Sequence, residues 1–135
     1  MTKIFNCASI VGGVVGGFLA KYLGGYDDIL RTLVILVVLD YVTGVLKAIS
    51  KKTLSSAVGF KGLIKKTLIF VVVATGVSVQ IVVGETIPLR EIVIVFFICN
   101  EAISLLENAS EFIPIPTKLK ETLIQLRDKS GKSAK

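Results

Sequence analysis

Residues 67–84 have the sequence TLIFVVVATGVSVQIVVG, an uncharged segment between Lys66 and Glu85 that is rich in valine and isoleucine. An α-helix rises about 1.5 Å per residue, so about 20 apolar residues cross a hydrocarbon core about 30 Å thick. A second uncharged segment, residues 4–20, lies near the N-terminus. Two such segments in one short chain predict an integral membrane protein.

The composition of the whole chain supports the same prediction. The chain has 135 residues, of which 53% are hydrophobic and 19% are charged, and its mean hydropathy is +0.78. Soluble proteins are about 45–50% apolar and about 25% charged. This composition excludes a water-soluble enzyme, a disordered tail and a multidomain protein.

Residues for catalysis or for holding a cofactor are missing from the sequence. It has no histidine, and its two cysteines, Cys7 and Cys99, are far apart, so no zinc site of the usual kind can form. The paired glycines, at 12–13 and 16–17, have no Lys-Ser/Thr after them to hold a phosphate. We therefore expect neither an enzyme nor a cofactor.

Four apolar segments predict an all-α protein with about four transmembrane helices within residues 1–112. The segments cover about residues 4–23, 29–49, 63–83 and 87–106. The first is rich in glycine, which lowers its helix propensity and its tendency to insert. If it does not insert, three spans remain and the N-terminus lies outside.

The distribution of lysine and arginine predicts the orientation of these spans. Basic residues are most abundant between the second and third segments and in the C-terminal tail, and basic flanks stay on the cytoplasmic side. We expect that connection to be a short flexible loop over residues 51–62, and we expect both the loop and the tail to be cytoplasmic. Aromatic residues for base stacking are not interleaved with the charges, so nucleic acid is not an expected partner. The lysines expected to determine topology are Lys51, Lys52, Lys61, Lys65 and Lys66.

Residues 113–135 form a basic tail that begins with two helix-breaking prolines, Pro114 and Pro116. A short amphipathic helix is expected over residues 117–128, followed by an unstructured end from residue 130. Its apolar stripe consists of Leu119, Leu123 and Leu126. This helix is too short and too charged to span, so we expect it to lie on the inner membrane face or to pack on a neighbouring subunit.

Small residues recur every fourth position in the first segment, in two neighbouring rows. Such rows let two helix backbones approach closely in a membrane. The second helix could come from the same chain or from another copy, and the sequence leaves both alternatives open. The expected packing residues are Ala8, Gly12, Gly13, Gly16, Gly17 and Ala20.

An acidic residue, Asp40, lies near the middle of the second segment and shares a helix face with Thr43, Gly44 and Lys47. An ionised group at this depth costs about 2.5–3.5 kcal/mol on insertion scales, so it normally faces protein or water. This face is therefore expected either to line a water-filled lesion or to fix an interface between subunits. The alternative is an internal ion pair with Lys47 or with a basic residue of another segment.

The fourth segment repeats this pattern with Asn100, Glu101 and Ser104. These residues are likewise candidates for lining a pore or for assembly, whereas Glu107 and Glu111 are expected in cytoplasmic water. Glu101 has three basic residues as expected partners within the chain: Lys47, Lys65 and Lys66.

Several motifs together resemble those of the toxin-secretion and phage-lysis holin family of Gram-positive bacteria and their phages. The motifs are LDYVTGVLKA at residues 39–48, LSS at 54–56, GFKGLIKK at 59–66, NEAISLLEN at 100–108 and PIPTKLK at 114–120. Their order and spacing extend over most of the chain from residue 30 onward.

The resemblance implies a protein that acts by assembly. Members accumulate in the bacterial cytoplasmic membrane, bind copies of themselves, and open lesions through which an endolysin or a large toxin passes. The resemblance supplies no catalytic residue, and it points to residues 40–47 and 100–107 as assembly or lining positions. Two other functions compete with this one: a small dimeric ion or multidrug transporter, and a membrane anchor or accessory protein.

Overall fold

The computed structural model describes residues 2–133, and within that range the chain folds into five helices and no strand. The helices are α1 (Thr2–Tyr22), α2 (Asp28–Ser50), α3 (Ser56–Val83), α4 (Leu89–Ala109) and α5 (Thr117–Ser133). The prediction of an all-helical protein is confirmed.

Side-chain caps fix where two of the long helices begin. The Asp27 carboxylate accepts a hydrogen bond from the Leu30 N–H at 3.1 Å and so starts α2. The Ser55 hydroxyl accepts one from the Val58 N–H, also at 3.1 Å, and so starts α3. Residues 56–62 are therefore helical, and the predicted flexible loop over residues 51–62 is wrong for most of its length.

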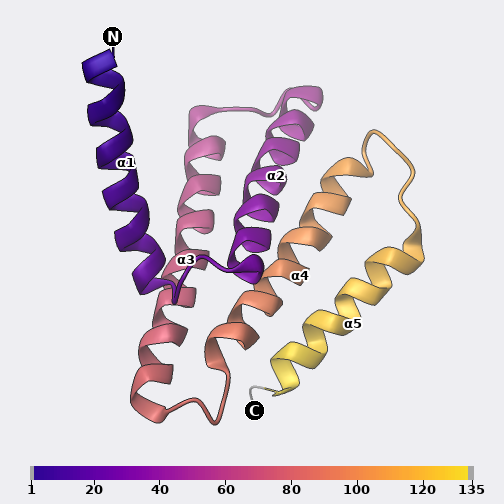
Figure 1. Cartoon of the computed structure of the whole chain (residues 1–135). Helices are drawn as coiled ribbons and strands as arrows, with labels where there is room; N and C mark the ends of the chain where they lie inside the picture. The colour runs from indigo at the N-terminus through magenta and orange to yellow at the C-terminus, as the bar shows by residue number, and fades with distance from the viewer. Residues whose placement is uncertain (1, 134–135) are drawn as a thin grey trace.

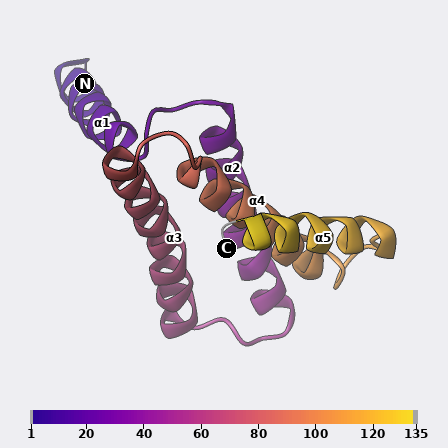
Figure 2. The ribbon, with the colours of Figure 1, turned by 90° about the horizontal axis from the view of Figure 1, so that it is seen from below.

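Helices α2, α3 and α4 form a bundle in which α3 runs antiparallel to the other two (Figure 1). Helix α5 turns back along α4, and α1 extends away from the bundle. The view from below shows α1 beside one end of α3 and α5 against α4 (Figure 2). The N-terminus lies at the same end of the bundle as the connection between α2 and α3.

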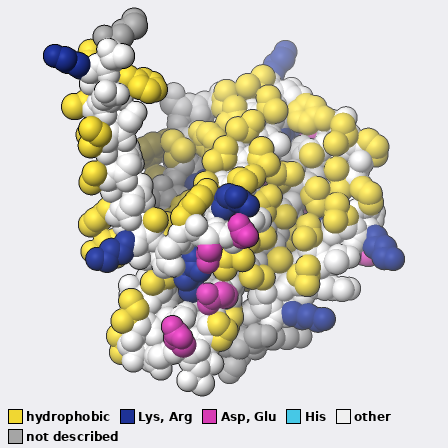
Figure 3. All heavy atoms as spheres, in the orientation of Figure 1, with side chains coloured by type: hydrophobic (Ala, Val, Ile, Leu, Met, Phe, Trp, Pro, Cys, Tyr) yellow, Lys and Arg dark blue, Asp and Glu magenta, His cyan; other side chains and the backbone are white. Residues whose placement is uncertain are grey.

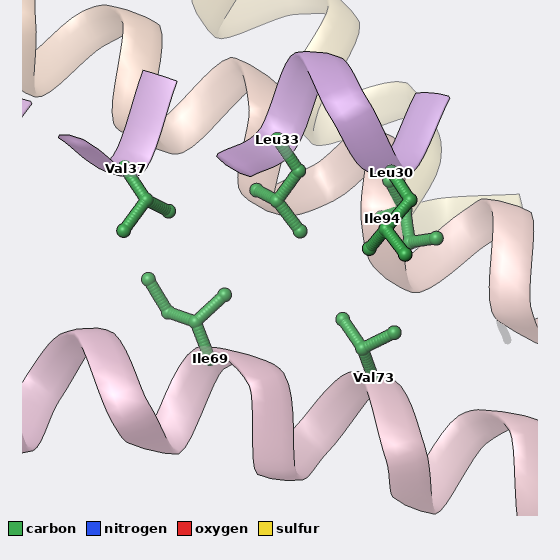
Figure 4. Packing of buried hydrophobic residues seen from close by; sticks show 6 residues of the cluster. All are labelled: Leu30, Leu33, Val37, Ile69, Val73 and Ile94. Carbon is green, nitrogen blue, oxygen red and sulfur yellow. The ribbon is translucent and has the colours of Figure 1, made fainter. Parts of the chain in front are cut away.

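The bundle is held by an apolar core between its three helices. Helix α2 contributes Leu30, Leu33 and Val37, and these meet Ile69 and Val73 of α3 and Ile94 of α4. In the close view the side chains of α2 and α3 point toward one another (Figure 4). Lipid tails are as apolar as leucine, so close packing of these branched side chains stabilises the bundle more than removal from water does. 

The outside of the structure suits a lipid environment. Ile4, Ile81 and Val82 are among many large hydrophobic side chains left exposed, and Figure 3 shows a face dominated by such side chains. Within residues 2–133, the helices long and apolar enough to cross a membrane are α1, α2 and α3. These three correspond to the first three predicted spans.

Helix α4 forms where the fourth span is predicted, but it is not among those three apolar helices. Its charged residues are Arg90, Glu91, Glu101 and Glu107. The predicted alternative of three spans also differs from this set, because it assumed the loss of the first segment, whereas α1 is one of the three.

The tail is more ordered than predicted. Helix α5 continues to Ser133 instead of ending at residue 128, so residues 130–133 are helical, while 134–135 lie outside the described residues. It packs on α4 of its own chain. The expected position on the inner membrane face or on a neighbouring subunit stays a prediction. Of the expected apolar stripe, Leu119 and Leu126 are 46% and 48% exposed, and Leu123 is half-buried.

Candidate functional site

A cluster of three charged side chains joins the helices of the bundle at the end of the apolar core. The Lys66 ammonium of α3 donates hydrogen bonds to the carboxylates of Asp40 in α2 and Glu101 in α4. Asp40 and Glu101 are 5% and 4% exposed. Each helix of the bundle thus contributes one charge, and we call these three residues the charge cluster.

A neighbouring amide completes the hydrogen bonding of the cluster. The Asn108 Nδ2 donates to the Asp40 Oδ1 at 3.0 Å and to the Thr43 Oγ1 at 3.2 Å. Gly44 lies on the same face, where a Cβ would stand 3.6 Å from the Asn108 Nδ2. The face of α2 that bears Asp40, Thr43 and Gly44 is therefore turned toward the second half of α4.

One ammonium serves two carboxylates, so the Lys66 cation is shared between α2 and α4. Removing one partner of a buried ion pair typically costs about 3–5 kcal/mol, because the other charge is left unpaired. The cluster therefore ties α2, α3 and α4 together only while all three helices are in place.

A cavity of about 280 Å³ adjoins the cluster. Its polar lining comes from Asp40, Lys65, Lys66, Ser104 and Asn108. Water occupies about 30 Å³ per molecule, so the cavity has room for several waters with polar partners. Among the predicted assembly residues, Asp40, Gly44 and Ser104 converge on this cavity, and Glu101 joins them through Lys66.

Two other predicted residues lie outside the cluster. The Lys47 ammonium lies 3.7 Å from the Glu111 Oε1, and the Lys51 ammonium lies 3.2 Å from the same atom. The hydrogen bond from Lys51 lowers the pKa of the Glu111 carboxyl below its ordinary value. Asn100 faces α5, where its Oδ1 accepts a hydrogen bond from the Arg127 Nη1 at 3.5 Å.

The ion pairs identify the partners of these residues within one copy of the chain. Asp40 has an internal partner from another helix, and that partner is Lys66, not Lys47. Glu101 has the same partner, so the half-buried Lys66 side chain lies between the helices of the bundle. A role of these residues in assembly or in lining a lesion stays a prediction.

The small residues of α1 are exposed and contact no helix closely. No heavy atom lies within 4 Å of a Cβ built at Gly12, Gly13, Gly16 or Gly17. These glycines and Ala20 border an open apolar groove of about 900 Å³, whose other wall comes from α2 and α3. Ala8 is also exposed. The structure thus does not choose between the two predicted partners of this surface.

A second charged contact, which the sequence did not reveal, holds the other end of the bundle. The guanidinium of Arg90, at the start of α4, donates to both carboxylate oxygens of Asp27, at 2.8 and 3.0 Å. It also donates to the carbonyl oxygens of Leu23 and Gly25, at 2.6 and 2.9 Å. The hydrogen bond from Arg90 lowers the pKa of the Asp27 carboxyl to about 2. 

This contact needs a glycine beside it. Gly24 has a φ of +84°, and a Cβ at this position would lie 2.5 Å from the Arg90 Nε. The Gly24-Gly25 pair before Asp27 was the available signal in the sequence, but nothing local connects it with an arginine so far along the chain.

Comparisons with known proteins agree with the motifs found in the sequence. The sequence model of the Bacteriophage holin family matches residues 17–128, so the chain belongs to that family. The "Probable holin" of Bacillus phage phi105 is 30% identical over 103 residues, which cover 76% of each chain. The resemblance deduced from the motifs is thereby confirmed.

Two bacterial proteins are more similar still. The "Uncharacterized 14.9 kDa protein in nagH 3'region" of Clostridium perfringens is 39% identical over 133 residues, 96% of this chain and 99% of the relative. An uncharacterized protein of Listeria monocytogenes is 37% identical over 122 residues, 88% of this chain and 87% of the relative. No solved structure gives a significant match.

Proposed function

We propose that this chain is a holin that assembles in the bacterial cytoplasmic membrane and opens lesions for an endolysin or a large toxin. Membership of the Bacteriophage holin family is the observation that carries the proposal. The three long apolar helices and the lipid-compatible surface support a multi-pass membrane protein. The holin family is not enzymatic, in keeping with the expected lack of catalytic residues.

The size of the chain requires many copies for a wide lesion. Each helix is about 10–12 Å across, and a 14.5 kDa chain has too few helices to enclose a passage for a folded protein. Copies of the chain are therefore the proposed partners, together with membrane lipid.

In the proposed topology α4 is the fourth span and the tail is cytoplasmic. The charge of Glu101 is compensated by Lys66, and that of Arg90 by Asp27, so α4 enters the membrane as part of the bundle and not alone. The basic connection around Lys51 and the basic tail then both lie inside.

The charge cluster is proposed to open during assembly. In one copy its carboxylates are satisfied by Lys66, and the adjoining cavity has polar groups in part of its wall. Rearrangement of the helices would present Asp40 and Glu101 to a neighbour or to water in the lesion. The chain would then have two states, one with these carboxylates paired inside a single copy and one with them turned outward.

Expression in a bacterium together with a folded cytoplasmic marker protein tests the function. A holin releases the marker abruptly, at a set time, with loss of the membrane potential. Graded flux of a small substrate would favour a transporter, and the absence of both effects would favour an accessory protein.

The role of the cluster is tested by Asp40→Asn and Glu101→Gln in the same assay. We expect a shifted time of release and a changed oligomer size, because each substitution removes a charge that Lys66 now balances. If both variants keep the timing and the oligomer size of the unsubstituted chain, the cluster has no part in assembly.

A further inference from the structure

Helix α5 covers one face of α4, and that face is built from an apolar centre with polar neighbours. Ile94 points into the core of the bundle, and Ile103 follows it by two and a half helical turns, so Ile103 points the opposite way. Ile103 is nevertheless only 6% exposed, and Cys99, on the same side, is 4% exposed. Neither belongs to the core cluster, and α5 is the helix packed on that side.

Polar contacts hold α5 in this position at two levels. The Lys120 ammonium lies 2.8 Å from the Glu107 Oε1, and the Arg127 Nη1 donates to Asn100. Leu123 and Ile124 lie on the same face of α5 as these two basic residues and are half-buried. The face of α4 turned to α5, which we call the covered face, thus has Cys99 and Ile103 buried at its centre and Asn100 and the exposed Glu107 at its edges.

This docked position conflicts with a bilayer around α4. Asn100 lies near the middle of α4, so Arg127 beside it would lie near the middle of the membrane. A basic residue at that depth costs about 2.5–3.5 kcal/mol, and α5 also carries Asp128 and Lys129 in the next positions. Docking of α5 on α4 therefore competes with a position of α4 across the bilayer.

The surface of the membrane is an alternative position for helix α5. Leu119 and Leu126 are 46% and 48% exposed, and together with the half-buried Leu123 they form an apolar stripe that α4 covers only at one edge. The link from Ser110 to Pro116 contains two prolines and lies outside both helices, so α5 can swing about it. A basic helix with such a stripe suits the surface of an anionic membrane.

We propose that the α4 face formed by Cys99, Asn100, Ile103 and Glu107 is a contact surface between copies of this chain, and that α5 occupies it until assembly. The face already accepts a helix, and Asn100 and Glu107 lose their α5 partners when that helix leaves. In lipid they then regain polar partners from the same face of a second copy. The inference rests on the proposed function, because it identifies the partner surface of an assembling holin.

The native cysteine reports the contact directly. The Cys7→Ser variant, reconstituted in phosphatidylglycerol–phosphatidylethanolamine vesicles, keeps Cys99 as the single thiol. Oxidation with copper phenanthroline is expected to give dimers linked through Cys99. Ile124→Glu places a carboxylate against the covered face and should raise the dimer yield about tenfold, since an unpaired buried charge opposes docking. Leu126→Glu, with the same charge change on the outer face, should leave the yield unchanged or lower it.

Charge reversal gives an independent check. Lys120→Glu faces Glu107 and should raise the dimer yield by no more than about fivefold, because an exposed ion pair contributes little. Adding Glu107→Lys should restore the original yield. Lys118→Glu, also on α5 and exposed, controls for the change in attraction to lipid.

Each outcome separates the inference from the function it rests on. Equal dimer yields in Ile124→Glu and Leu126→Glu would overturn the proposed surface. So would vesicles that release a large dextran without any Cys99 dimer, although the holin function would then stand. If no variant forms oligomers or releases dextran at high loading, the proposed function itself fails.

Discussion

At the scale of single residues, Lys66 balances two carboxylates at once. Lys66→Met leaves Asp40 and Glu101 buried without a cation, so we expect a loss of about 3–5 kcal/mol in the free energy of unfolding in detergent. Lys65→Met removes the same charge from an exposed neighbour and should have little effect. Stability should return in the triple variant Asp40→Asn, Glu101→Gln, Lys66→Met; an unstable triple variant would contradict the electrostatic explanation.

The contact of Asp27 with Arg90 predicts a pH dependence of stability. Its folded pKa of about 2 lies below the ordinary value of 3.8, so its contribution to stability is complete above pH 3.8 and is lost as the pH falls toward 2. The difference in thermal stability between the unsubstituted chain and Asp27→Asn should therefore shrink over that range. Asparagine keeps the helix cap, and Asp28→Asn, whose partner is the exposed Arg31, is the control. A difference that does not change between pH 4 and 2 would rule out the Arg90 contact as its source.

At the scale of helices, the sequence predicts the features of single helices better than the contacts between them. The uncharged run at residues 67–84 and the periodic placement of Asp40, Thr43 and Gly44 each depend on one helix alone. The structure has a long apolar helix at the first and a shared face at the second, as the sequence predicts. The partner of Asp40 depends on how α3 is rotated against α2, which periodicity does not give. Arg90 at the start of α4 contacts Asp27 at the start of α2, far away in the sequence, so no local pattern predicts this contact.

The start of α3 has a loop-like sequence, with glycines at 59 and 62 and small residues at 55–57. The Ser55 cap and the fit of the Tyr41 side chain over the two glycines make this segment helical. Ser55→Ala should cost about 1 kcal/mol and increase amide exchange in residues 56–62, whereas Ser55→Asp should retain both values. Equal exchange in Ser55→Ala and the unsubstituted chain would show that tertiary packing alone sets the start of α3.

At the scale of the whole molecule, the topology depends on the charge cluster. Helices α1, α2 and α3 are long and apolar enough to cross a membrane, whereas α4 carries Glu101, whose charge is balanced by Lys66 of α3. If α4 spans, the tail lies in the cytoplasm; if it does not, three spans leave the tail outside.

A Ser130→Cys variant with the native cysteines replaced by serine distinguishes the two topologies with a membrane-impermeant thiol reagent on intact cells. We expect this cysteine to be protected in the otherwise unsubstituted chain and labelled when Lys66→Met is added, since an unpaired Glu101 opposes insertion. Lys65→Met should leave it protected, and Glu101→Gln with Asp40→Asn should restore protection to the Lys66→Met chain. Labelling in every variant would mean that α4 stays outside the membrane, and the four-span topology would then be abandoned.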